Sequence, residues 1–158
     1  MTAMSRKDRE ARRNMMIAST IGGMAFISSN VGAVHAFAET VGAWFDTPHG
    51  VANSLFLPYI MEFNIPACPE RFADIADAMG IEREESMSDE QYALKAVEYV
   101  KALNRKLNIP TIKEIKGITE ERLEAIAERS DNNVLSNDNA RKITKEDYLE
   151  LLKKDYNE

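Results

Sequence analysis

The sequence predicts an all-α protein, folded as a bundle of about six or seven helices. Three observations carry this prediction. Apolar residues recur every three or four positions in several segments, which is the spacing of one helical face. Residues that favour helix ends, namely Ser, Thr, Pro and Gly, stand at the borders of these segments. No segment alternates apolar and polar residues between turn signals, as a half-buried strand does.

The helical segments are expected to form a single domain over residues 1–158, with a polar loop at 130–140. The expected helices are residues 6–27, 31–45, 49–64, 70–79, 88–107, 119–129 and 144–156. The first begins after Ser5 as N-cap, with Asp8 as an acid in its first turn. The second is rich in small residues, which permit close packing. Pro58 predicts a kink or break in the third, because proline cannot donate the helical hydrogen bond.

Capping residues mark the borders of the later helices. Pro69 is a favoured first helical residue, and Gly80 is expected to end the fourth helix. Ser88 and Gln91 have the spacing of a capping box at the start of the fifth helix. Thr119 is the expected N-cap of the sixth. These signals place helix ends from the sequence alone.

Residues 14–68 contain no Lys or Arg, only three acids and both histidines, although 29% of the whole chain is charged. A stretch this apolar is expected to form a buried core. The net charge of −6 argues against non-specific binding to nucleic acid, despite a local charge of +3 over residues 1–13 (five basic residues and two acids). The single Cys68 can form neither an internal disulfide nor a multi-thiolate metal site, and it fits a reducing cytoplasm.

A secretory signal peptide is the alternative for the N-terminal region. Residues 6–13 are basic, residues 15–27 are fairly apolar, and residues 36–38 (Ala-Phe-Ala) imitate a cleavage site. Several Ser, Thr, Gly and Asn residues interrupt the apolar run, and Asp8 and Glu10 lie within the basic part. We therefore expect a retained N-terminus, no membrane span and a cytoplasmic protein.

The two histidines are the best candidates for chemistry. His35 is expected in the middle of one helix and His49 at the start of the next, so a turn between them can bring the imidazoles together. Imidazole is the commonest protein ligand for metals. Glu39 follows His35 by four residues and shares its helical face, where it can complete a site or orient a ring. From spacing alone, two structural histidines in a core are the more ordinary interpretation.

The sequences around these histidines are Gly-Ala-Val-His-Ala at 32–36 and Asp-Thr-Pro-His-Gly-Val-Ala-Asn at 46–53. They resemble the helical domain of the iron-containing alcohol dehydrogenases, and weaker similarity extends over nearly the whole chain. In that family one Asp and three His hold the metal, and the last two histidines match His35 and His49. The resemblance therefore implies that these two residues are ligands for a divalent metal, Fe or possibly Zn.

Two departures from the family pattern accompany the resemblance. The upstream Asp and His ligands, and the Gly-rich loop that binds NAD(P), have no counterpart in this sequence. Glu39 occupies a position where many relatives have a histidine near the reacting end of the cofactor, so it is only a weak catalytic candidate. The family reaction interconverts an alcohol and an aldehyde or ketone. We therefore expect this chain to be the C-terminal metal-binding portion of a truncated or split enzyme, and to be inactive alone.

The alternative is a non-enzymatic helical module that self-associates or pairs with a separately encoded N-terminal half. Loss of the nucleotide-binding domain is expected to expose apolar surface around His35, Trp44 and His49, and such surface favours association. The expected partners are a second copy or a complementary N-terminal half. In a two-fold dimer, two histidine pairs could offer four imidazoles to one metal, with Glu39 as an extra ligand.

Overall fold

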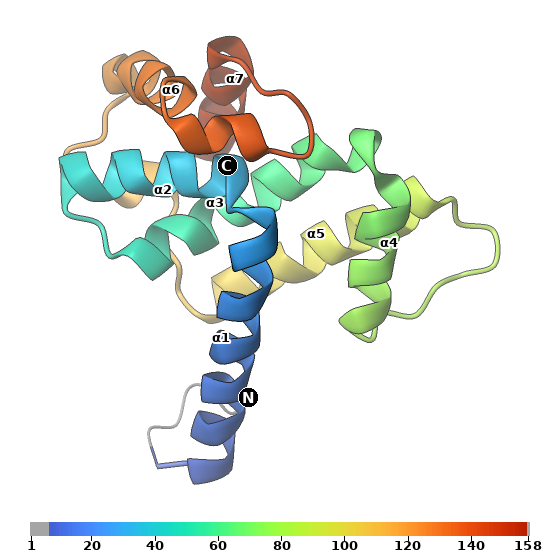
Figure 1. Cartoon of the computed structure of the whole chain (residues 1–158). Helices are drawn as coiled ribbons and strands as arrows, with labels where there is room; N and C mark the ends of the chain where they lie inside the picture. Colours follow the sequence, from blue (N-terminus) through green and yellow to red (C-terminus); the bar gives the residue numbers. More distant parts are fainter. Residues whose placement is uncertain (1–6, 158) are drawn as a thin grey trace. The chain divides into compact units, whose positions relative to one another are not determined.

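The structure is a computed structural model that describes residues 7–157, and these residues confirm the all-α prediction. They form seven α-helices with short 3₁₀ turns and contain no strand (Figure 1). The helices are α1 (Arg9–Ser29), α2 (Gly32–Phe45), α3 (His49–Asn64), α4 (Pro69–Ala78), α5 (Asp89–Lys106), α6 (Leu123–Asp131) and α7 (Lys145–Asn157). Three of the 3₁₀ turns are η2 (Ile65–Ala67), η3 (Ile112–Glu114) and η5 (Val134–Asp138).

The chain divides into two compact units, residues 1–31 and 32–158. In the first unit, the described part is α1. Asp8 is its N-cap, because its side chain accepts a hydrogen bond from the backbone N–H of Ala11 at 3.0 Å. The prediction that Asp8 lies inside the first turn was therefore wrong, while the predicted cap Ser5 lies outside the described residues. The expectation of one domain stays a prediction.

The apolar stretch 14–68 behaves differently in the two units. Its α2 and α3 segments are buried, as predicted, but α1 exposes most of its large apolar side chains. Met24 and Ile27, for example, are 68% and 79% exposed. A single helix has no neighbour within its own unit against which to bury them. The expectation of a continuous buried core was therefore wrong for α1.

The helix α3 runs from His49 to Asn64 through Pro58, so of the predicted kink or break the break was wrong, while the kink stays a prediction. Pro58 has no N–H to donate to the carbonyl of Ser54, one turn earlier. That carbonyl instead accepts a hydrogen bond from the side-chain amide of Asn104 in α5, at 2.6 Å. A tertiary contact thus satisfies the group that proline leaves unpaired, and the helix continues.

Three local predictions have different outcomes. The capping box is confirmed: Ser88 and Gln91 exchange backbone-to-side-chain hydrogen bonds at the start of α5. Thr119 makes no side-chain cap bond, and a 3₁₀ turn precedes α6. The predicted polar loop at 130–140 is shorter in the structure, because α6 continues to Asp131 and the 3₁₀ turn η5 follows. Ser130 is buried there, and its hydroxyl is satisfied because it donates to the carbonyl of Ile126 at 2.8 Å.

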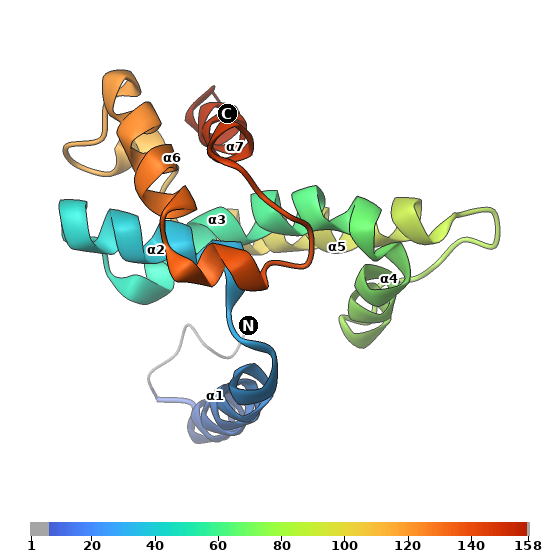
Figure 2. The ribbon, with the colours of Figure 1, turned by 45° about the horizontal axis from the view of Figure 1, so that its top comes forward.

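The second unit contains two apolar clusters. In the larger one, α2 and α3 pack with α6 and α7, which lie together on one side of them (Figure 2). Its centre is aromatic: the Phe37 ring stacks on Phe56 with centroids 4.3 Å apart and meets Tyr148 edge-on at 4.5 Å. The smaller cluster lies between α4 and α5, around the fully buried Tyr92. The first cluster fixes the relative positions of α2 and α3, which carry the two histidines.

The unfolding free energy is expected to fall between about pH 10 and 12 in part because of Tyr148. Burial raises the pKa of this phenol from 10.0 to about 12, against a lowering by its hydrogen bond with Ser136. In the unfolded chain the phenol ionises above pH 10, while in the folded chain it stays neutral up to about pH 12. The stabilisation is thus complete below pH 10 and is lost as pH rises through the folded pKa.

The variant Tyr148→Phe tests this expectation. It loses the 2.6 Å hydrogen bond to Ser136, so we expect a loss of about 1 kcal/mol at pH 7. Its stability should then fall less steeply above pH 10 than that of the wild type. Urea unfolding at pH 7 and pH 10.5 measures both effects. An equally steep alkaline decline in Tyr148→Phe would show that this phenol is not the titrating group.

Candidate metal centre

A short turn between α2 and α3 brings the two histidines together. The helix α2 ends at Phe45, and Asp46 adopts a left-handed backbone conformation (φ 50°) that starts the turn. Gly42 lets the turn lie close, since a Cβ there would sit 3.3 Å from the carbonyl oxygen of Thr47. The rings of His35 and His49 then lie with centroids 5.2 Å apart, tilted by 54°. The predicted convergence of the imidazoles is confirmed.

Asn53 fixes the position of the His49 ring. Its side-chain nitrogen donates to the carbonyl oxygen of His49 at 2.9 Å and lies 3.0 Å from Nε2 of the same residue. Since this amide nitrogen carries two protons, one hydrogen bond can go to each acceptor when the ring proton is on Nδ1. The Nε2 lone pair then points at Asn53. A metal ion bound through Nε2 would replace this hydrogen bond.

The Asn53 side chain also offers an unused acceptor. Its Oδ1 is buried and has no hydrogen-bond partner among the described residues. A buried acceptor without a donor costs about 1–3 kcal/mol, so the site is favourable for a group that brings a proton or positive charge. His35 is half-buried and His49 is exposed, so the pair is accessible from one side. Two imidazoles at this separation fit a role as part of the ligand set of an iron or zinc ion.

Glu39 is exposed and its carboxylate contacts the connection between α6 and η5. Its Oε2 accepts a hydrogen bond at 2.8 Å from the side chain of Asn133, which precedes η5. Within residues 7–157, no group of three or more His, Cys, Asp or Glu is placed to hold a metal ion. The described residues thus offer two imidazoles rather than a complete site. The catalytic role of Glu39 stays a prediction.

The sequence did not predict which groups the two amides that hold the His49 and Glu39 side chains would contact. Asn53 follows His49 by four residues on a helix, so its spacing could have revealed the contact. Asn133 is 94 residues from Glu39, and no local pattern joins them. Trp44, which was expected to lie in an exposed apolar surface, is 46% exposed beside Phe45. It adds an aromatic surface near the turn.

The chain belongs to the iron-containing alcohol dehydrogenase family. Residues 1–156 match the family model for the C-terminal part of the Fe-containing alcohol dehydrogenase family. Lactaldehyde reductase of Escherichia coli (strain K12) is 38% identical over 144 residues, which are 91% of this chain and 37% of the reductase. The 1,3-propanediol dehydrogenase of Klebsiella pneumoniae is 41% identical over 130 residues, 81% of this chain and 33% of that enzyme.

Solved structures agree with the family assignment. A 1,3-propanediol oxidoreductase superposes with a TM-score of 0.88 at 34% sequence identity. The superposition covers 94% of this chain and 39% of the oxidoreductase chain. An alcohol dehydrogenase from Oenococcus oeni superposes with a TM-score of 0.86 at 38% sequence identity. Here the superposition covers 93% of this chain and 38% of the dehydrogenase chain. The chain therefore corresponds to well under half the length of these relatives. The match identifies it with the helical C-terminal part of the family.

No single helix within residues 7–157 is both long enough and apolar enough to cross a membrane, although α1 and α2 counted together satisfy the test of length and composition.

Proposed function

We propose that this chain supplies two metal ligands, His35 and His49, to an NAD(P)-dependent alcohol dehydrogenase that interconverts an alcohol and an aldehyde or ketone. The observation that carries the proposal is the pair of imidazoles 5.2 Å apart on α2 and α3, in a chain of this family. A bound divalent metal supplies Lewis-acid polarisation of the alcohol oxygen. His35 and His49 hold the ion, and Asn53 sets the orientation of the His49 ring.

The rest of the site comes from a nucleotide-binding N-terminal portion. Two imidazoles leave most positions on a divalent ion to water or to other ligands, so the isolated chain binds metal weakly. The relatives are named as NADPH-dependent or NAD-dependent in several cases, such as the butanol dehydrogenase of Clostridium saccharobutylicum and the methanol dehydrogenase of Bacillus methanolicus. This chain alone is therefore proposed to be inactive.

Exposed apolar side chains support association with a partner. Seven of them lie on α1 alone: Met15, Met16, Ile17, Ile21, Met24, Phe26 and Ile27. Trp44, close to the histidine turn, is another. Apolar surface of this kind is usually covered by a partner. The nucleotide-binding portion is the proposed partner, and a helical module that only self-associates is the second candidate, favoured by the same exposed residues.

A chimera of the two parts tests the proposed function. In it, this chain replaces the matching 37% of the Escherichia coli lactaldehyde reductase. With added iron or zinc, the chimera is expected to reduce aldehydes or oxidise alcohols, followed at the absorbance band of the reduced nicotinamide. The isolated chain should show no turnover, because it offers two ligands and no cofactor loop. A folded chimera without activity under every metal would support the non-enzymatic module instead.

A further inference from the structure

A short segment after η5, residues 139–141, joins the start of α2 to the end of α3, and we call it the clasp. The side-chain Oδ1 of Asn139 accepts a hydrogen bond from the backbone N–H of Ala33 at 3.4 Å and another from the side chain of Asn64 at 3.1 Å. The side-chain nitrogen of Asn139 donates to Oδ1 of Asn64 at 2.7 Å and to the carbonyl of Arg141 at 2.8 Å. An amide has two donor protons and two acceptor lone pairs, so Asn139 uses its full hydrogen-bonding capacity.

The clasp is anchored on the end of α3. The guanidinium of Arg141 donates to the backbone carbonyl of Phe63 at 3.1 Å and lies 4.2 Å from the centre of the Phe63 ring. This carbonyl belongs to the last turn of α3, where backbone carbonyls lack helical partners and a cation is favourable. Asn64, the last residue of the helix, is 7% exposed, so its amide pair with Asn139 is largely shielded from water.

The same clasp supports the first turn of α2. Backbone N–H groups of a first turn have no partner within the helix, so the turn frays unless an acceptor outside it binds them. Val31, which precedes the helix, has an apolar side chain and cannot cap it. Gly32 fits closely against the clasp: it adopts φ +61°, and a Cβ there would lie 3.2 Å from Oδ1 of Asn139. Asn139 is thus a cap supplied from 106 residues away from Ala33.

His35 lies in this first turn, two residues after Ala33. Its ring lies 5.2 Å from that of His49, which is the first residue of α3. Two imidazoles chelate one ion only when both rings keep a fixed separation and direction. Fraying of the first turn of α2 would displace His35 but leave His49 in place. The geometry of the pair therefore depends on what holds that turn.

We propose that Asn139 is a positioning residue for the metal ligand His35. It caps α2 from an anchor on α3, and so keeps the two imidazoles at the separation that one ion needs. It acts through the backbone at Ala33, so its effect is on the geometry of the pair rather than on the ion itself. This role rests on the proposed function, in which both histidines hold the metal.

Copper(II) is the probe for this role, because among divalent first-row ions it binds nitrogen ligands most tightly. The chain has two histidines, so every imidazole signal comes from His35 or His49. Pulsed electron paramagnetic resonance of the untagged full chain counts the imidazoles on the bound copper. The wild type should show two. Asn139→Ala should show one, with an affinity lower by about tenfold or more, the loss typical when a residue that orients a metal ligand is removed.

Three further variants separate positioning from stability, which urea unfolding measures for each. Asn137→Ala replaces an exposed amide two residues earlier and should keep two imidazoles on copper. Tyr92→Phe removes the hydrogen bond to Asp77 at 2.7 Å in the smaller apolar cluster, so it should lower the urea midpoint but also keep two imidazoles. Arg141→Gln changes an exposed residue, loosens the clasp from its α3 side and should weaken copper binding by a smaller factor than Asn139→Ala.

The possible outcomes distinguish this role from the proposed function. Two imidazoles and an unchanged affinity in folded Asn139→Ala would overturn the positioning role alone, and Arg141→Gln decides in the same way if Asn139→Ala does not fold. An equal loss in Tyr92→Phe would also overturn it, because general destabilisation would then be the cause. A single imidazole already in the wild type would contradict the joint ligation by His35 and His49, and the positioning role with it.

Discussion

Replacing His49 by alanine in the chimera is expected to lower kcat/KM for the alcohol by about 10³-fold or more. The Lewis acid contributes several kcal/mol to the transition state, and each 1.36 kcal/mol is a factor of ten. Removal of one of the two imidazoles that converge at 5.2 Å leaves a single ligand from this chain. Initial rates at saturating nicotinamide cofactor, with metal added in excess, measure the loss.

The control for this variant is Ser54→Ala, one turn away on α3. The Ser54 hydroxyl donates to the carbonyl of Gly50 in its own helix, a bond that involves neither histidine, so the activity should be retained. The kcat/KM of Asn53→Ala should lie between those of His49→Ala and Ser54→Ala, because a residue that orients a metal ligand typically contributes about 10–100-fold to metal affinity. Full activity of a folded His49→Ala chimera would refute the role of this residue.

Replacing Phe37 by alanine is expected to destabilise the second unit by about 3–5 kcal/mol. The ring is fully buried, stacks on Phe56 at 4.3 Å and meets Tyr148 edge-on at 4.5 Å. Truncation removes its burial and both aromatic contacts, which add about 0.5–1.5 kcal/mol each beyond buried area. Since these residues join α2, α3 and α7, the resulting cavity weakens the scaffold of the histidine pair.

Urea unfolding followed by circular dichroism measures this loss. The control is Tyr99→Ala in α5, where the ring is 50% exposed, and its stability should stay within about 0.5 kcal/mol of the wild type. If Phe37→Ala were as stable as Tyr99→Ala, the aromatic cluster would not be the centre of this core.

Local sequence signals predicted the helix ends best where capping is local. The capping box of Ser88 and Gln91 involves only neighbouring residues, and its prediction is confirmed. Pro58 shows the opposite case. Its effect on α3 depends on the side chain of Asn104, which is 50 residues from its acceptor Ser54 in sequence. The rule for proline predicted a kink or a break, and the break does not occur because of a contact that no local pattern contains.

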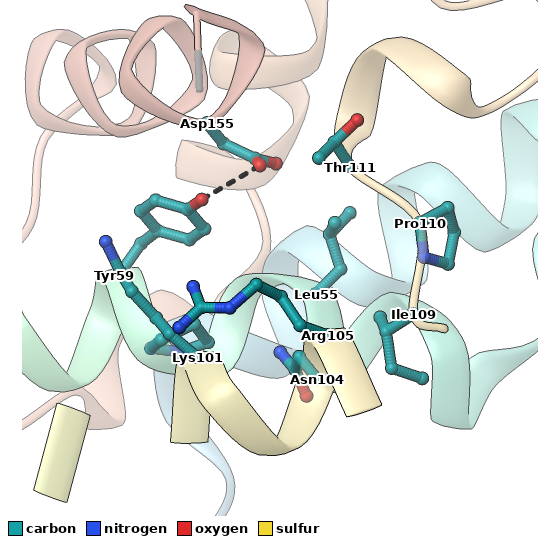
Figure 3. Close-up of a pocket in the computed structure, with 10 residues that line it drawn as sticks. Leu55, Tyr59, Lys101, Asn104, Arg105, Ile109, Pro110, Thr111 and Asp155 are labelled. Carbon is teal, nitrogen blue, oxygen red and sulfur yellow. Dashed lines mark hydrogen bonds between the residues drawn. The ribbon is translucent and has the colours of Figure 1, made fainter. Parts of the chain in front are cut away.

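The candidate metal centre was predictable in part. A helix, a turn and a second helix place His35 and His49 within reach of each other, and the structure confirms their convergence. The family motif added the expectation that they bind metal. The cavity between α3, α5 and α7 (Figure 3) was not predictable, because three helices and a connecting segment distant in sequence contribute to its walls.

His35 and His49 are proposed to bind the metal of an alcohol dehydrogenase. Metal content of the purified chimera, after gel filtration and elemental analysis, tests it most directly. The wild-type chimera should contain about one iron or zinc ion per chain, and the double variant His35→Ala/His49→Ala should lose nearly all of it while it still binds the cofactor. An unchanged metal content in the folded double variant would contradict it.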